Sequence, residues 1–172
     1  MSKVDTEHHA FHSVLRERIV EHVFLGGLLR HLWRMRRFDV EVLRAEFDAG
    51  GYDLVVRCGA VIRYIQLKVG RLGGATASVK VSLGLSGRPG GCVIWIVVDD
   101  DLNIDHFRWF GDAPESALPG LEALKVARHV KGNAQGEKLE RANHRVLPKS
   151  RFERIDGFDA LSIRLFGVQG GA

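Results

Sequence analysis

The sequence predicts an α/β domain in which a mixed central sheet, built from an antiparallel meander and a buried central strand, is flanked by helices. Three observations predict this fold class. Apolar residues recur every three or four positions between Thr6 and Arg37, as they do in an amphipathic helix. Residues 52–57 and 61–69 are two strand-like apolar runs separated by a turn. The run at 92–98, CVIWIVV, is apolar throughout and rich in β-branched residues, which favours a strand buried on both faces.

Length and composition indicate one globular domain. The chain has 172 residues, of which 45% are hydrophobic and 27% charged, and this balance is ordinary for a folded protein. We expect a single domain over residues 1–172, with a core at about 10–112 and a basic C-terminal segment at 121–166. The longest apolar run is far shorter than the roughly 20 residues that span a bilayer, so no membrane segment is expected.

The N-terminus and the cysteines bear on the location of the protein. The first residues show no apolar segment of signal-peptide length and no small-residue cleavage pattern. Cys58 and Cys92 lie within or beside strand-like sequence, without the spacing of a disulfide framework, which favours buried and reduced thiols. The sequence therefore predicts a cytoplasmic protein.

The first expected element is the long N-terminal helix. Gly26 and Gly27 weaken its middle by roughly 1 kcal/mol each relative to alanine, so a kinked helix and two separate helices are both open alternatives. A strand over DVEVLRAEF follows, because its valines alternate with acidic residues, and the turn formers DAGG end it.

The next two runs are expected to pair as an antiparallel hairpin centred between Gly59 and Ala60. This register places Asp53 directly opposite Gln66 and puts Lys68 on the same face, because alternate residues of a strand share a face. The opposite face is apolar apart from one arginine, so it is expected to pack on the core. An acid, an amide and an amine thereby converge on one face of the sheet.

The remainder of the chain is less regular. In order, we expect a Gly-rich loop with a short element near 79–85, the buried strand, a strand over 104–110, a helix within 115–127, an irregular basic stretch over 132–150 and a closing helix over 158–166.

The polar face of the hairpin is the strongest candidate for a site. A carboxylate, an amide oxygen and an ammonium on a rigid sheet, next to a basic segment, suit a hard divalent cation and a phosphate. The alternative is a solvent-facing sheet whose Asp, Gln and Lys make ordinary cross-strand contacts. The site hypothesis depends mainly on Asp53 and Lys68.

The order and spacing of these residues resemble the PD-(D/E)XK, or restriction-endonuclease-like, nucleases, a family that includes Holliday junction resolvases and many restriction enzymes. Asp53 in GYDLVV matches the motif Asp. Gln66-Leu67-Lys68 matches the Glu-x-Lys motif, with Gln in the acidic position. The resemblance implies a restriction-endonuclease-like fold, in which a helix bearing a Glu, a strand, this hairpin, a second helix and further strands follow one another.

The resemblance also implies an acidic residue on the first helix. Glu21 would be this residue, and Glu17 is its competitor because it lies one turn earlier on the same side. The resemblance covers roughly residues 17–110. The chain departs from the family pattern at two points, since no Pro precedes Asp53 and Gln66 carries no charge.

The activity implied by the resemblance is hydrolysis of a phosphodiester with Mg²⁺. Lys68 would orient the nucleophile and stabilise the transition state. Because Gln lacks the negative charge of Glu, we expect weaker metal affinity and a gain from Mn²⁺, which binds similar ligands more tightly. The implied metal ligands are oxygens of Asp53, the Gln66 side chain, the Leu67 backbone carbonyl and, through water, Glu21.

Three function classes are open. The first is a metal-dependent endonuclease that acts on nucleic acid, with DNA as the expected substrate. Family members that cut both strands often pair two active centres, so the resemblance implies a homodimer. The second is a catalytically inactive nuclease-fold protein that binds nucleic acid or assembles with a partner. In this case the Gln in place of the motif Glu at position 66 would be the sign of a lost active centre. The third is a dimeric interaction protein that binds no nucleic acid.

Basic residues are concentrated toward the C-terminus of a chain whose net charge is +4. Such a segment is the expected footprint of a polyanion, and a solvated surface that keeps the protein soluble explains it equally well. The candidate phosphate contacts are Lys138, Arg141, Arg145, Lys149 and Arg151.

Two further groups have simpler explanations. His8 and His12 have the spacing of a zinc-binding pair on a helix, yet no Cys or acidic motif accompanies them, so a solvated terminus is favoured. Arg30, Arg34 and Arg37 share one helical face, where they complement the helix dipole or contact phosphates.

Overall fold

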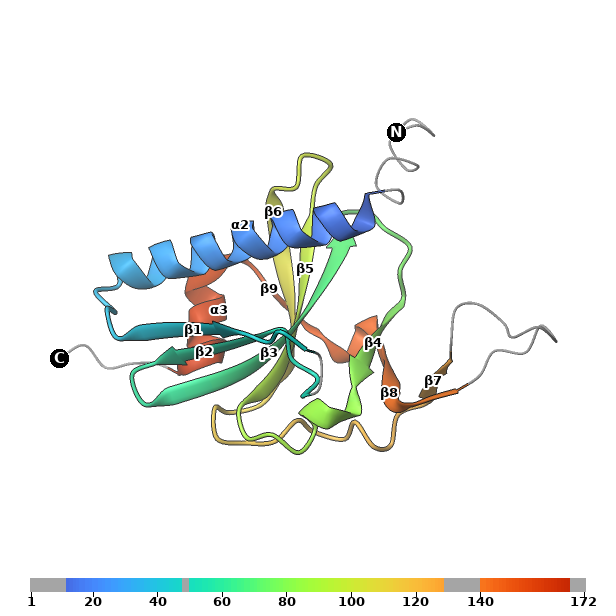
Figure 1. Cartoon of the computed structure of the whole chain (residues 1–172). Helices are drawn as coiled ribbons and strands as arrows, with labels where there is room; N and C mark the ends of the chain where they lie inside the picture. Colours follow the sequence, from blue (N-terminus) through green and yellow to red (C-terminus); the bar gives the residue numbers. More distant parts are fainter. Residues whose placement is uncertain (1–11, 48–49, 129–139, 168–172) are drawn as a thin grey trace.

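The structure is a computed structural model that describes residues 12–47, 50–128 and 140–167 (Figure 1). Over these residues the fold is mixed α/β, as the sequence predicts, with a six-stranded mixed sheet in the order β1-β2-β3-β5-β6-β9, a three-stranded antiparallel sheet in the order β4-β8-β7, and two α-helices. The bounds are α2 Ser13–Arg34, β1 Val40–Arg44, β2 Leu54–Cys58, β3 Val61–Arg71, β4 Ser78–Ser82, η1 Leu83–Leu85, β5 Gly91–Val98, β6 Ile104–Gly111, β7 Val126–Arg128, β8 Glu140–Pro148, η2 Lys149–Arg151, β9 Glu153–Ile155 and α3 Gly157–Phe166.

α2 is one continuous helix that lies across one face of the larger sheet (Figure 1). Its buried apolar side chains recur every four positions from Val20 to Leu32, so a single stripe of the helix packs on the sheet. The helix does not divide at Gly26 and Gly27, because this packing holds both halves on the same core. Neither helix of the described residues is long and apolar enough to cross a bilayer.

α3 packs beside α2 on the same face, and the two glycines of α2 meet different surroundings there. A Cβ at Gly27 would collide with the ring of Phe158 in α3. A Cβ at Gly26 would meet open space. Gly27 therefore permits the close approach of the two helices, whereas Gly26 has no packing role.

We expect Gly26→Ala to raise the free energy of unfolding by about 1 kcal/mol, because alanine has the higher helix propensity and the added methyl meets nothing. Gly27→Ala should lower the free energy of unfolding, because overpacking against Phe158 costs roughly 1–3 kcal/mol. Urea denaturation of the two variants, which differ by one position in the same helix, measures both changes. Equal shifts would contradict the close packing of α3 on Gly27.

β2 and β3 form the predicted hairpin in the predicted register. Cys58 pairs with Val61 next to the turn, and Leu54 pairs with Ile65 at the other end of the ladder. β5 continues the sheet parallel to β3. All 8 residues of β5 are buried, so the prediction of a buried central strand is confirmed.

The second face of the larger sheet is covered by the three-stranded sheet and by loops. Val81 of β4, Leu147 of β8 and Leu121 of the loop after β6 are buried in one cluster with Val93 of β5. Both helices lie on the first face, where they share the other core cluster. The expectation that helices flank the sheet is therefore met on one face only.

Two expected segments are corrected by the structure. The helix expected within 115–127 is wrong, because turns occupy most of this stretch and Pro119 followed by Gly120 interrupts any helix. The irregular structure expected over 132–150 is wrong for residues 140–148, which form β8, and residues 132–139 lie outside the described part. The short element expected near 79–85 is β4 followed by η1.

Arg63 is the one arginine on the apolar face of the hairpin, and its fully buried side chain caps the C-terminal end of α3. Its Nε donates to the carbonyl of Leu165 at 2.6 Å and its Nη2 to that of Arg164 at 2.7 Å. Further bonds reach the carbonyls of Asp112 at 3.0 Å and Ala113 at 3.3 Å. Burial lowers the pKa of Arg63. The negative end of the helix dipole stabilises the cation there.

Candidate active site

β3 is longer than β2, and this difference opens the sheet edge where the candidate site lies. The ladder between the two strands ends at Leu54 and Ile65, whereas β3 continues to Arg71. Asp53 lies just outside the ladder, and its N–H donates to the carbonyl of Ile65 at 2.8 Å. Its carboxylate turns to the edge of β3, where Oδ2 accepts the N–H of Leu67 at 2.6 Å. A side-chain oxygen thereby satisfies a backbone donor that no longer has a strand partner on that side.

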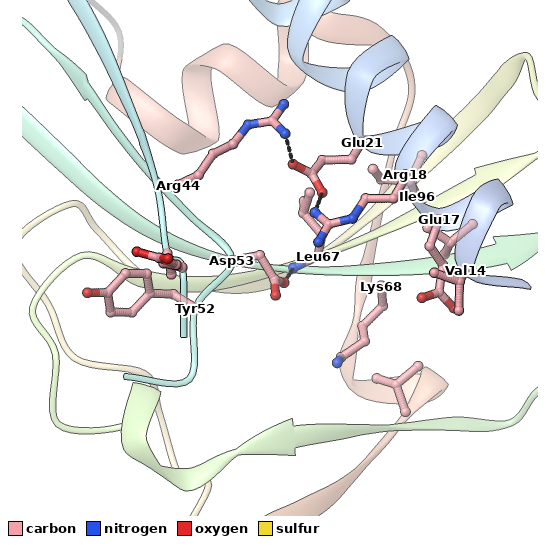
Figure 2. A pocket seen from close by; sticks show the side chains of 14 residues that line it. Val14, Glu17, Arg18, Glu21, Arg44, Tyr52, Asp53, Leu67, Lys68 and Ile96 are labelled. Atoms are coloured by element: carbon pink, nitrogen blue, oxygen red, sulfur yellow. Dashed lines mark hydrogen bonds and ion pairs between the residues drawn. The ribbon is translucent and has the colours of Figure 1, made fainter. Parts of the chain in front are cut away.

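A cavity of about 460 Å³ lies at this edge, between the N-terminal half of α2, the end of β1, β3 and β4. Figure 2 shows Glu21 reaching from α2 on one side of β3 and Lys68 leaving β3 on the other, with Asp53 between them. The edge position therefore lets side chains from both faces of the sheet reach one space. The charged residues that line it include Glu17, Arg18, Glu21, Arg44, Asp53 and Lys68.

Glu21 and Glu17 both reach the cavity from α2, one helical turn apart. Only 12% of the Glu21 side chain is exposed, and its carboxylate is ion-paired with Arg18 and with Arg44, each at 3.1 Å. Glu17 is exposed, and its carboxylate has no hydrogen bond or ion pair with the described residues. Glu21 is thus held in place by two cations, whereas the Glu17 carboxylate is open to the cavity.

Gln66 does not line the cavity, although the next three residues of β3 do. Its side chain is directed to the face that carries the three-stranded sheet, where it is 3% exposed and its Oε1 accepts the N–H of Ser82 at 3.2 Å. Asp53 leaves the ladder, so its carboxylate meets the backbone of Leu67 rather than the Gln66 amide. The structure therefore brings Asp53, Leu67 and Lys68 together with the two glutamates of α2 and separates Gln66 from them.

The oxygen donors at the cavity are of the kind that Mg²⁺ prefers. The N–H and C=O of one strand residue point to the same sheet edge, so the carbonyl of Leu67 points to the edge at which Asp53 lies. Within residues 12–47, 50–128 and 140–167, no group of three or more His, Cys, Asp or Glu is gathered as metal ligands. A carboxylate and a carbonyl still fit Mg²⁺, because this ion often takes one or two carboxylates and keeps several waters.

The residues predicted to contact phosphate lie on different elements of the structure. Arg141 and Arg145 lie on β8, Lys149 and Arg151 form part of η2, and Lys138 lies outside the described residues. Arg145 is partly buried, and its Nη1 donates to two carbonyls of its own strand at 2.7 and 3.2 Å. Lys149 lines a second cavity, which is rich in basic side chains.

Arg30 and Arg34 are exposed near the C-terminal end of α2, as either of the sequence explanations requires. His8 lies outside the described residues, so the structure does not place the pair that it forms with His12.

Arg18 and Arg44 were not singled out from the sequence. The spacing of three residues between Arg18 and Glu21 could have indicated the first contact. No local signal could have indicated the second, because it depends on where β1 lies relative to α2.

Comparisons with protein-family models, with curated proteins and with solved structures each found no match, so function is inferred from the residues themselves.

Proposed function

We propose that this chain is a metal-dependent endonuclease of the restriction-endonuclease-like type, which hydrolyses phosphodiester bonds of DNA. The observation that carries the proposal is the Asp53 carboxylate fixed at Leu67 on the open edge of β3, with Lys68 in the same cavity. A carboxylate and a carbonyl that can hold a cation, beside a long cationic side chain, are groups suited to phosphodiester hydrolysis. The order helix, strand, hairpin and further strands agrees with what the family resemblance implies, whereas β4 and η1 lie between β3 and β5 where that order has a second helix.

In the proposed reaction, a water oxygen attacks phosphorus, one ester P–O bond breaks, and the leaving oxygen takes up a proton. The Lys68 ammonium binds a nonbridging phosphate oxygen and orients the water, so it offsets the negative charge that builds up in the transition state. Asp53 and the Leu67 carbonyl would hold Mg²⁺ or Mn²⁺. The bound ion would supply Lewis-acid chemistry and a more acidic bound water.

The acid contributed by α2 is one of two residues. Glu21 would act through a metal-bound water, in exchange for one of its two arginine contacts. Glu17 would act directly, since its carboxylate has no partner among the described residues. Both carboxylates lie in the cavity, so either position agrees with the proposal.

The proposed partners are DNA and a second copy of the chain. DNA agrees with the net charge of +4 and with the basic side chains of β8 and η2. The homodimer follows from the family resemblance, because enzymes that cut both strands often pair two active centres.

A second candidate function is a nuclease-fold protein that binds nucleic acid without cutting it. The position of Gln66 favours this function, because its side-chain oxygen is buried and already accepts the N–H of Ser82. The two arginines on Glu21 favour it as well, since they compete with a cation for the carboxylate.

Incubation of supercoiled plasmid and of branched DNA with the protein tests the proposal. We expect cleavage with Mg²⁺, stronger cleavage with Mn²⁺, and none with EDTA, because the metal is held by few protein ligands. DNA binding without cleavage under every metal condition would support the second candidate and contradict the first. Neither binding nor cleavage would contradict both.

A further inference from the structure

A second cavity, of about 280 Å³, lies where the ends of β3 and β5 meet β6, β9 and η2. Side chains from all of these elements line it. None of the described residues in its lining is acidic. Four residues of the lining have a basic side chain that is longer than histidine, namely Arg71, Arg108, Lys149 and Arg154.

Two buried ring nitrogens in this lining have no hydrogen-bond partner among the described residues, and they are Nε1 of Trp95 and Nε2 of His106. Trp95 is 3% exposed and His106 is 2% exposed. An indole N–H can only donate, and a buried donor without an acceptor costs about 1–3 kcal/mol. The Trp95 nitrogen lies directly over Gly70, where a Cβ would collide with it. The absence of a side chain at position 70 thus leaves room for this donor.

The second nitrogen of His106 is already engaged. Nδ1 lies 2.6 Å from Oδ2 of Asp105, which is also 3.8 Å from Arg154. In the neutral ring that donates Nδ1–H to Asp105, Nε2 is an acceptor, and Nε2 donates only when the ring carries both protons. The Trp95 N–H is therefore the nitrogen that always calls for an acceptor, and none of the described residues supplies one.

The cations around these nitrogens are only partly compensated. Arg71 is ion-paired with Asp100 at 2.6 Å, and Arg154 with Asp156 at 2.9 Å. The side-chain cations of Arg108 and Lys149 have no ion pair or hydrogen bond within the described part of the chain. Two uncompensated cations beside the unpartnered Trp95 N–H complement a phosphate, which offers negative charge and acceptor oxygens.

The strand register connects this cavity to the candidate active site. Lys68 pairs with Trp95, Trp95 with Arg108, and Arg108 with Arg154, so the four residues form one row on one face of the sheet. Neighbouring strands lie about 4.8 Å apart, which separates the backbones of Lys68 and Arg108 by roughly 10 Å. Consecutive phosphates of one DNA strand rise about 3.4 Å along the axis and also turn around it, so this distance spans one or two phosphates.

We propose that this cavity is a phosphate subsite, which binds a backbone phosphate of the nucleic acid one or two positions away from the one cleaved beside Lys68. Arg108 and Lys149 contact the phosphate charge, and Nε1–H of Trp95 donates to one of its oxygens. Contacts to phosphate fix the position of the strand without reading bases. The identity of the ligand as nucleic acid rests on the proposed function, whereas the affinity for phosphate does not.

Titration with inorganic phosphate, without DNA or metal, tests the subsite by NMR of the indole N–H groups. The chain has 3 tryptophans, so Trp33 and Trp109 serve as internal references, and Trp95→Phe identifies the remaining signal. We expect a saturable shift of the Trp95 signal alone. Arg108→Gln should raise the Kd for phosphate about tenfold, through loss of a charge-assisted contact.

The matched control is Arg36→Gln, the same change at an exposed position just after α2, which should leave the Kd unchanged. A Trp95 signal that does not respond, or three indole signals that respond alike, would overturn the phosphate subsite. An unchanged Kd in Arg108→Gln would overturn it as well.

A short single-stranded oligonucleotide, again without metal, distinguishes nucleic acid from free phosphate as the ligand. A shift of the Trp95 signal with both probes supports the proposal, and a shift with inorganic phosphate alone would overturn the assignment to a backbone phosphate. In cleavage assays, Arg108→Gln should raise KM roughly tenfold with little change in kcat, because a distant phosphate is bound alike in the ground and transition states.

The two proposals can fail separately. A Trp95 shift with the oligonucleotide, in a protein that cuts no DNA, would leave the subsite in place and contradict the endonuclease. Metal-dependent cleavage without any shift of the Trp95 signal would support the endonuclease and contradict the phosphate subsite.

Discussion

Asp53→Asn and Lys68→Gln should each lower the rate of DNA cleavage by about 10²–10³-fold, with little change in DNA binding. Asn keeps the shape of Asp53 and can still accept the N–H of Leu67, so this change removes mainly the charge at the edge of β3. Gln at position 68 removes the ammonium that offsets transition-state charge. Single-turnover cleavage of plasmid DNA measures the rate, and a DNA mobility shift in EDTA measures binding.

The control for this experiment is Glu46→Gln. Glu46 lines the same cavity, and its carboxylate has no hydrogen bond or ion pair within the described residues. The change removes one negative charge, as Asp53→Asn does, and the variant should cleave DNA at the same rate as the parent protein. Parental rates in Asp53→Asn or Lys68→Gln would contradict the assigned roles, and equal rates in all preparations would indicate a contaminating nuclease.

Arg63→Ala should lower the free energy of unfolding by about 3–5 kcal/mol, the usual cost of breaking a buried charged contact. Its side chain is fully buried and donates to four backbone carbonyls, including those of Leu165 and Arg164 at the end of α3. Alanine would leave these acceptors buried without a donor and would open a cavity beneath Trp109, whose ring centroid lies 5.4 Å from the guanidinium. Urea denaturation followed by circular dichroism measures the change.

Two further variants keep this prediction testable if Arg63→Ala does not fold. Arg63→Lys retains the charge but loses the planar fork, so its loss of stability should be smaller than that of alanine. Arg57→Ala removes an arginine of the neighbouring strand whose ion pairs with Asp39 and Glu41 are exposed, and it should change stability little. Similar midpoints for Arg63→Ala and Arg57→Ala would contradict the structural role of Arg63.

The sequence was sufficient to predict the hairpin and the central strand, because both depend on local patterns. Alternation of apolar residues and the turn at Gly59 fix the pairing of Leu54 with Ile65, and uninterrupted apolar residues over β5 indicate burial on both faces. The same alternation marked Arg63 as an exception on the core face. Its partners could not be predicted, since they come from the loop after β6 and from the end of α3, which are about 50 and about 100 residues away.

The arrangement of the site was less predictable, because it depends on where regular pairing stops. Strand alternation placed Asp53 opposite Gln66, and it did not indicate that Asp53 would leave the ladder and turn to Leu67. The inward position of Gln66 depends on Ser82, which belongs to a different sheet. β8 has little alternation of its own, and its pairing with β4 supplies the hydrogen bonds that make it a strand.

The stretch of β3 from Leu67 to Val69 has no strand partner on the β2 side among the described residues. An open strand edge of this kind is a template for aggregation through pairing with other chains, and natural proteins guard such edges with charged side chains, lysine above all. Lys68 lies within this stretch, and Arg71 is the last residue of β3. The lysine proposed to act in cleavage therefore also protects the protein from self-association, so an apolar replacement there would cost solubility together with activity.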